Sequence, residues 1–140
     1  MKNMYEIFDQ FEESSSKKER MDVIEKNLSH TLTEVLKLTY HPQYEWLVSD
    51  LPENYKAPDT LPGISISQIS AQLRKLYLFQ KGNPTAEKLS PQKRNELLLQ
   101  ILESLEFREA EVVIGIFKKD LGVKGLNYKF VKEAFPNLIP

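Results

Sequence analysis

Apolar residues recur at helical spacing from the start of the chain. Met4, Ile7, Phe8 and Phe11 follow the i, i+3, i+4, i+7 pattern that gathers side chains on one face of an α-helix, and they predict a first helix there. No segment shows the alternation of apolar and polar residues that is typical of a half-buried strand. The pattern therefore predicts an all-α fold, a compact single-domain bundle of about six to eight helices spanning residues 1–140.

Two capping signals predict where the next helices begin. Ser16 with Glu19, and Thr31 with Glu34, have the spacing of a capping box, in which each side chain accepts a hydrogen bond from a free backbone N–H of the other residue. Pro42 then prevents the third helix from continuing. The apolar or inward-facing stripes that follow the two caps are Met21, Ile24 and Leu28, and then Leu32, Val35, Leu36 and Thr39.

The middle of the chain is rich in residues that break helices. Residues 49–66 read as a long ordered loop, and residues 44–48 before them are compatible with a short helical turn. The breakers within the loop are Pro52, Pro58, Pro62 and Gly63.

Two further helices follow this loop. Ser67 is placed to cap the first, which should end at the Gly82 to Pro84 breaker, and Ser90 with Pro91 are favoured residues for the start of the second. The inward-facing stripes expected on these helices are Ile69, Leu73, Leu76 and Tyr77, and then Leu97, Leu98, Ile101, Leu102 and Leu105.

The last part of the chain predicts a mostly buried helix, a turn and a short final helix. Apolar residues surround most of the helix expected at 109–119, where Gly115 would permit close contact with another helix. A glycine-containing turn at 122–127 follows. The residues expected to face inward are Ala110, Val112, Val113, Ile114, Ile116 and Phe117, and in the short helix Phe130, Val131 and Ala134.

Composition excludes several classes of site and location. The chain has no cysteine and two histidines, which excludes disulfides and thiolate ligands and disfavours a His-rich metal site. No stretch approaches the roughly 18 apolar residues of a membrane span, and the acidic N-terminus is unlike a signal peptide. The protein is therefore predicted to be cytoplasmic, in the host cell if phage-encoded, with no membrane partner.

Familiar catalytic motifs are missing from the sequence. The string nearest to a Lys-x-Asp-Gly nucleophile motif runs from Lys118 to Leu121 and lacks the glycine, and no phosphate-binding Gly-rich loop, zinc-binding helix or serine-hydrolase elbow occurs. We therefore expect no enzyme activity, no catalytic residue, no cofactor and no metal. Residues weighed and assigned to surface, capping or solvated roles are Glu12, Glu13, Glu109, Glu111, His30 and His41.

Aromatic residues near the end of the third helix allow two interpretations. Trp46, with Tyr40 and Tyr44, could stack against nucleic-acid bases. Aromatic groups between helices more often fill core space, and packing is the favoured interpretation.

Charge is unevenly distributed although the total is −1. Residues 74–140 carry 12 Lys and Arg against 8 Asp and Glu, whereas residues 1–73 carry 7 against 12. The segment 118–132 has five lysines and one acid, Asp120, around a turn and a helix start. Backbone N–H groups at a helix start and lysine side chains both favour phosphate, but a solvated basic face that complements a helix C-terminus fits the same residues.

Two sequence blocks resemble a known family. IEKNLSHTLTEVLKLTYHP, at 24–42, and FKKDLGVKGLNYKFVKEAFPNLIP, at 117–140, are similar to the two ends of the N-terminal DNA-binding domain of bacteriophage T4-type ATP-dependent DNA ligases. The resemblance covers most of the chain at a distance. It implies contact with the DNA backbone and minor groove beside a nick.

The resemblance extends to particular residues of the second block. Lys119 and Asp120 match the family's basic residue and aspartate, Gly125 its turn glycine and Lys129 a position that is often basic, while Asn127 replaces a small hydroxyl residue. The family's Cys-Gly-type turn is extended here and lacks cysteine. The chain ends where the adenylation domain should begin, so nick sealing is not expected.

These observations together predict a non-catalytic duplex-DNA-binding module of low sequence specificity, in phage DNA replication or repair. The partner would be duplex or nicked DNA. One alternative is an adaptor of a replication complex that has lost DNA binding, and another is a ligase fragment that works with a catalytic chain in trans. The predicted DNA-binding residues are Lys118, Lys119, Lys124, Gly125, Asn127, Tyr128, Lys129 and Lys132.

Overall fold

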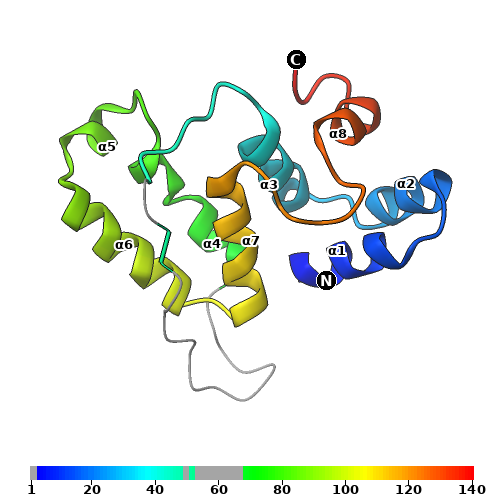
Figure 1. Cartoon of the computed structure of the whole chain (residues 1–140), viewed down its shortest axis with the longest axis horizontal. Helices are drawn as coiled ribbons and strands as arrows, with labels where there is room; N and C mark the ends of the chain where they lie inside the picture. The colour runs from blue at the N-terminus through cyan, green and yellow to red at the C-terminus, as the bar shows by residue number, and fades with distance from the viewer. Residues whose placement is uncertain (1–2, 49–50, 53–67) are drawn as a thin grey trace. The chain divides into compact units, whose positions relative to one another are not determined.

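The computed structural model describes residues 3–48, 51–52 and 68–140, and these are helical with no extended sheet (Figure 1). The all-α prediction is confirmed. Most of the loop predicted at 49–66, and the predicted cap Ser67, lie outside the described residues. The helices are α1 (Met4–Glu13), α2 (Lys17–Lys26), α3 (His30–Tyr40), α4 (Ile69–Leu73), the 3₁₀ helix η1 (Leu76–Phe79), α5 (Pro84–Lys88), α6 (Pro91–Glu103), α7 (Phe107–Lys118) and α8 (Tyr128–Ala134).

Contacts divide the chain into two compact units. The terminal unit combines residues 1–43 with residues 115–140, and the central unit is formed by residues 44–114. α7 begins in the central unit and ends in the terminal unit. None of the helices in the described part of the chain is long and apolar enough to cross a membrane.

The terminal unit has an aromatic core that joins its two sequence segments. All four residues of the predicted α1 stripe are buried, and Phe11 is fully so. The Phe11 ring meets Phe130 of α8 edge-on, with centroids 4.9 Å apart and planes at 87°. Aromatic pairs favour this arrangement because the positive ring edge faces the negative ring face.

The capping signals of α2 and α3 work differently from the predictions. The Ser16 hydroxyl accepts from the Glu19 N–H at 3.2 Å as expected, but the Glu19 carboxylate accepts from the N–H of Ser15, at 2.9 Å. α3 is capped by Ser29, whose hydroxyl accepts from the Leu32 N–H, so the Thr31 cap was wrong. A serine two residues earlier satisfies the free N–H groups first.

The inward stripe predicted for α2 holds only in part. Ile24 is buried and Met21 half-buried, whereas Leu28 lies after the helix end and is 57% exposed. α3 follows its prediction, with Leu32, Val35 and Leu36 buried and the buried Thr39 hydroxyl donating to the Val35 carbonyl at 2.7 Å. A buried hydroxyl on a helix commonly finds its partner in this way.

The central unit contains an extended strap in place of the helical turn expected at 44–48. The Leu47 N–H donates to the Phe79 carbonyl at 2.6 Å, and the Lys81 N–H donates to the Glu45 carbonyl at 2.8 Å. Trp46 and Gln80 form an isolated antiparallel bridge between these bonds. The expected turn was wrong because the backbone groups of the strap are satisfied by a segment distant in the sequence.

The single helix predicted after Ser67 is broken into α4 and η1. A 3₁₀ helix has three residues per turn, so Leu76 and Phe79 share one face and are buried while Tyr77 turns outward and is 48% exposed. The breaker predicted after it also starts a helix. The Asn83 side chain accepts from two backbone N–H groups at the start of α5, and Pro84 occupies its first position.

α6 and α7 confirm the clearest helical patterns of the sequence. Ser90 caps α6 by accepting from the Lys93 N–H at 3.1 Å. The predicted stripe of α6 is buried except for Leu97, which is half-buried. Gly115 in α7 approaches the turn that follows, because a Cβ on it would lie 3.0 Å from the Leu121 Cα. Gly115 therefore permits close contact with the turn after α7, whereas the sequence predicted contact with another helix at this position.

Candidate nucleic-acid interface

The predicted basic segment begins at the C-terminus of α7. The Lys119 N–H donates to the Ile116 carbonyl, and the Asp120 N–H donates to the Gly115 carbonyl, which together form a Schellman motif. This motif places Lys119 in the left-handed region with φ 61°, a position usually taken by glycine. The Lys119 ammonium donates to the His41 carbonyl at 2.7 Å, which joins the end of α7 to the end of α3.

The turn after α7 is held in one shape by side-chain and backbone contacts. The Asp120 carboxylate accepts from the Gly122 N–H at 2.9 Å, and Gly122 and Gly125 have φ angles of 70° and 86°. The Lys124 N–H donates to the carboxylate of Glu12, on α1, at 3.1 Å. The turn is therefore fixed from within and by the N-terminal segment.

A buried tyrosine secures the far end of the same turn. The Tyr40 hydroxyl donates to the carbonyl of Leu126 at 3.2 Å, and both residues are buried. Burial disfavours the phenolate and raises the pKa of Tyr40 to about 12. Tyr40 therefore has a structural role, in agreement with the packing interpretation of this residue.

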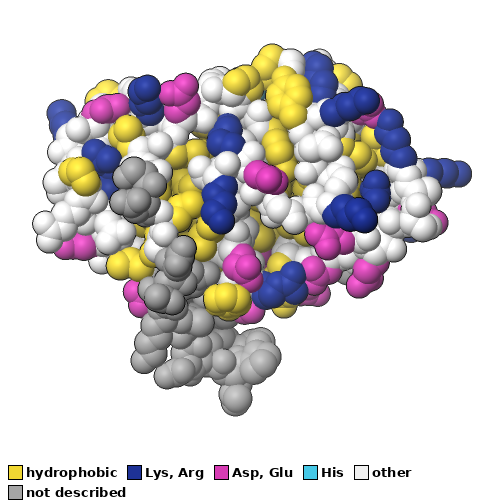
Figure 2. Space-filling view, in the orientation of Figure 1, with side chains coloured by type: hydrophobic (Ala, Val, Ile, Leu, Met, Phe, Trp, Pro, Cys, Tyr) yellow, Lys and Arg dark blue, Asp and Glu magenta, His cyan; other side chains and the backbone are white. Residues whose placement is uncertain are grey.

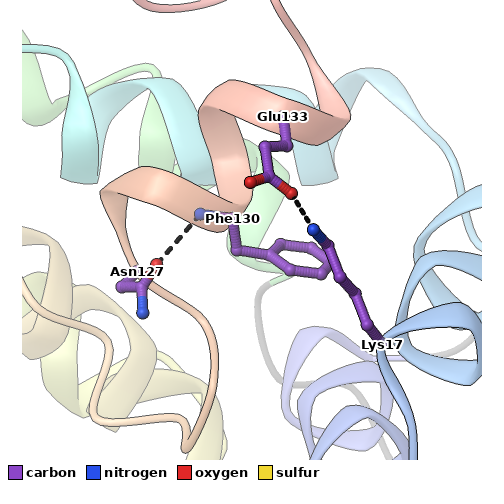
Figure 3. Close-up of polar contacts among 4 residues, drawn as sticks. All are labelled: Lys17, Asn127, Phe130 and Glu133. Atoms are coloured by element: carbon purple, nitrogen blue, oxygen red, sulfur yellow. Dashed lines mark hydrogen bonds and ion pairs between the residues drawn. The ribbon is translucent and has the colours of Figure 1, made fainter.

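α8 starts at the end of the turn and packs against α1 and α2. The Asn127 side chain caps the helix by accepting from the Phe130 N–H at 2.9 Å, and Lys17 of α2 forms an ion pair with Glu133 (Figure 3). The hydrogen bond from Lys17 lowers the pKa of Glu133, and the nearby charges of Lys17 and Lys129 act in the same direction. The Oδ1 atom of Asn127 is therefore engaged by the cap of α8.

The C-terminal tail engages two more of the predicted residues. The Lys132 ammonium donates to the carbonyls of Pro136 and Ile139 at 2.9 and 3.1 Å. The Tyr128 hydroxyl donates to the Pro140 carbonyl, although its ring remains 41% exposed. Lys132 therefore holds the tail against α8.

The five lysines of the segment divide into two groups. The ammonium groups of Lys119 and Lys132 donate to backbone carbonyls, so these two lysines contribute to the fold. Lys118, Lys124 and Lys129 are exposed, and within the described residues no hydrogen bond or ion pair engages their ammonium groups. Figure 2 shows Lys and Arg side chains over the part of the terminal unit formed by α2 and α8.

One basic residue near this segment was missed by the sequence analysis. The guanidinium of Arg20, in the first half of α2, lies against Gly125, where an added Cβ would come within 2.9 Å of its Nη1 atom. It also lies over the ring of Phe11, with Cζ 5.8 Å from the ring centroid. Arg20 stands among residues of mixed charge, so its own segment gave no signal of this contact.

The remaining candidate residues differ in their surroundings. Tyr44 and Trp46 stack on each other with centroids 5.9 Å apart and planes at 10°. The His41 Nδ1 atom accepts from the Gln43 N–H at 3.1 Å, and His30 is exposed in the first turn of α3. Glu109 is buried, at 6% exposure, so its predicted solvated role was wrong, because α7 is enclosed on most sides. Among the described residues no cluster of three or more His, Cys, Asp or Glu could hold a metal ion.

Comparisons with known proteins found a similar fold and a matching family. A solved structure titled Pmar-Lig_PreS3 shares the fold with a TM-score of 0.63 and 19% sequence identity, over 96% of this chain and 31% of that one. The chain therefore spans about a third of the length of that structure. No curated protein matches this chain. A family of unknown function, DUF6433, matches residues 7–123, and the chain therefore belongs to that family.

Proposed function

We propose that this protein is a non-catalytic module that binds duplex DNA through its phosphate backbone and minor groove with little sequence specificity. Three exposed lysines, Lys118, Lys124 and Lys129, carry the proposal, because no hydrogen bond or ion pair among the described residues engages their ammonium groups. The turn between α7 and α8, which carries Lys124, is fixed in shape. Lysines of this kind can neutralise phosphates and release the counterions of DNA, which favours binding at low salt.

Two further observations support a DNA-related function, which we propose to be phage replication or repair in the host cytoplasm. The resemblance to the ligase N-terminal domain is carried by residues 24–42 and 117–140 and covers most of the chain at a distance. The structure with a similar fold has the ligase-like syllable Lig in its title, and its chain is about three times as long as the matched part. The protein partners that we propose beside DNA are a catalytic ligase chain in trans or another replication protein.

A salt-dependent titration tests the proposal. Fluorescence anisotropy with labelled intact and nicked duplex, at about 50 and about 200 mM salt, gives the affinity and the slope of log affinity against log salt. We expect the Lys118→Glu, Lys124→Glu, Lys129→Glu variant to lose roughly one unit of slope for each phosphate contact removed. Its thermal midpoint should stay near that of the parent protein, because the three side chains are exposed.

A variant with the same change in charge controls for the total charge. Lys75, Lys88 and Lys93 are exposed in the central unit, and their replacement by glutamate changes the net charge equally. Duplex binding should survive this control substitution. Equal loss in both triple variants, or no binding by the parent at low salt, would contradict the proposed interface and leave the adaptor hypothesis in its place.

A further inference from the structure

The guanidinium of Arg20 is held between a ring and a glycine turn. The ring of Phe11 covers one side, 5.8 Å from Cζ. On the Gly125 side, an added Cβ would lie 2.9 Å from Nη1, 3.0 Å from Cζ and 3.4 Å from Nε, so the whole planar group lies close to this turn. An arginine held in this way loses little conformational freedom when it binds a ligand.

The hydrogen-bonding groups of Arg20 have no partner within the described residues. Its Nε atom is buried without a hydrogen bond, and no carboxylate forms an ion pair with the guanidinium there. The carboxylates of Asp120 and Glu12 accept from the Gly122 and Lys124 N–H groups of the turn, and neither forms an ion pair with Arg20. A half-buried charge without a partner is costly, and a bound anion would compensate for that cost.

We propose that Arg20 and the turn at Gly125 form a binding site for one phosphate group of the nucleic-acid backbone. The planar guanidinium presents paired N–H donors whose spacing matches two phosphate oxygens. Lys124 lies next to the glycine in the sequence, and Lys129 follows at the start of α8, so further positive charge is carried by the same segment. This proposal rests on the proposed function and adds a residue from α2 to it.

The structure also indicates why Gly125 is glycine. Its φ angle of 86° is unfavourable for other residues, and a Cβ would fit there only if the Arg20 guanidinium moved away. The same glycine therefore shapes the turn and admits the guanidinium. A substitution that displaces Arg20 from this turn should remove the site without removing its charge.

Conservative substitutions of Arg20 test the site. We expect Arg20→Lys, which keeps the charge and loses the planar fork, to weaken duplex binding about tenfold, and Arg20→Gln to weaken it more and reduce the salt slope by about one unit. Lys26→Gln is the matched control, because this exposed residue on the same helix carries the same charge. Unchanged affinity in both Arg20 variants, in a protein that binds duplex, would overturn the proposal.

A second measurement separates this proposal from the DNA-binding function. Titration of the full chain with inorganic phosphate, followed by NMR, should shift the Arg20 Nε–Hε and Gly125 amide signals in the parent protein and not in Arg20→Lys. If duplex binding is absent while these shifts occur, the site stands and the proposed function fails. If no shift occurs with phosphate and Arg20→Lys binds duplex as the parent does, the site itself is wrong.

Discussion

Each of the two units holds one half-buried arginine, and the two differ in what their guanidinium groups meet. Arg94 of the central unit donates to the carbonyls of Leu47 and Leu89, at 3.2 and 2.9 Å. Arg20 of the terminal unit donates to no acceptor among the described residues, although a ring and a glycine turn hold it in place.

The difference distinguishes a charge used by the fold from one available to a ligand. Arg94 connects the strap, through Leu47, to the residue that precedes the cap of α6. The lysines differ in the same way. The Lys132 ammonium donates to backbone carbonyls of the C-terminal tail, whereas Lys129 is exposed. Hydrogen bonds to backbone carbonyls therefore identify which basic residues of a charged segment are structural.

Removal of Arg94 should have the largest effect on stability. Arg94→Met leaves two carbonyls without their charged donor, and we expect a loss of about 2 to 3 kcal/mol in the free energy of unfolding. Urea denaturation followed by fluorescence of Trp46, the single tryptophan, measures it in the central unit. Arg20→Met should cost about 1 kcal/mol, because only packing and a cation–π contact are lost. Equal losses for the two variants would remove the distinction.

Substitution of Gly125 should come next, because it strains the backbone and also displaces Arg20. We expect Gly125→Ala to cost about 2 kcal/mol and to weaken duplex binding. Gly122→Ala is a close control, since Gly122 has a φ of 70° and nothing within 4 Å of an added Cβ. It should lose stability from the same kind of strain and keep its affinity. A similar loss of binding in both variants would show that the turn's shape matters and Arg20 does not.

Tyr40 tests whether a side chain of the terminal unit that donates to a backbone carbonyl contributes to stability, as Arg94 does in the central unit. Tyr40→Phe removes the hydrogen bond to Leu126 and should cost about 1 kcal/mol at neutral pH. The folded pKa of about 12 lies above the unfolded value of about 10, so the unfolded state loses its proton first and stability falls as pH rises between these values. Urea denaturation at several pH values should show this fall in the parent and a flatter profile in the variant.

The smallest expected effect concerns the acidic neighbour of the turn. Glu12→Gln keeps an oxygen that can accept from the Lys124 N–H and removes one negative charge beside the basic segment. We expect duplex affinity to rise about twofold at low salt, with a smaller gain at high salt because exposed charges are screened. The anisotropy titration measures this. Weaker binding would indicate that the Glu12 carboxylate is needed to hold the turn.

Periodicity and capping residues were sufficient to predict most helices. The apolar stripes of α1, α6 and α7 and the serine caps of α2 and α6 are local signals, because each arises from residues within one or two turns of one another. The errors occurred where distant segments supply the partners. The strap at 44–48 is extended because it pairs with residues 79–81.

The sequence alone determined that this chain is all-α and that its positive charge is concentrated near residues 118–132. Only the tertiary structure decided which of those charges are exposed, because Lys119 contacts the end of α3 and Lys132 contacts the C-terminal tail. It also brought Arg20 of α2 against Gly125, which is distant in the sequence. Charge is a property of the residue, whereas the partner of a charge depends on which backbone groups folding brings within hydrogen-bonding distance.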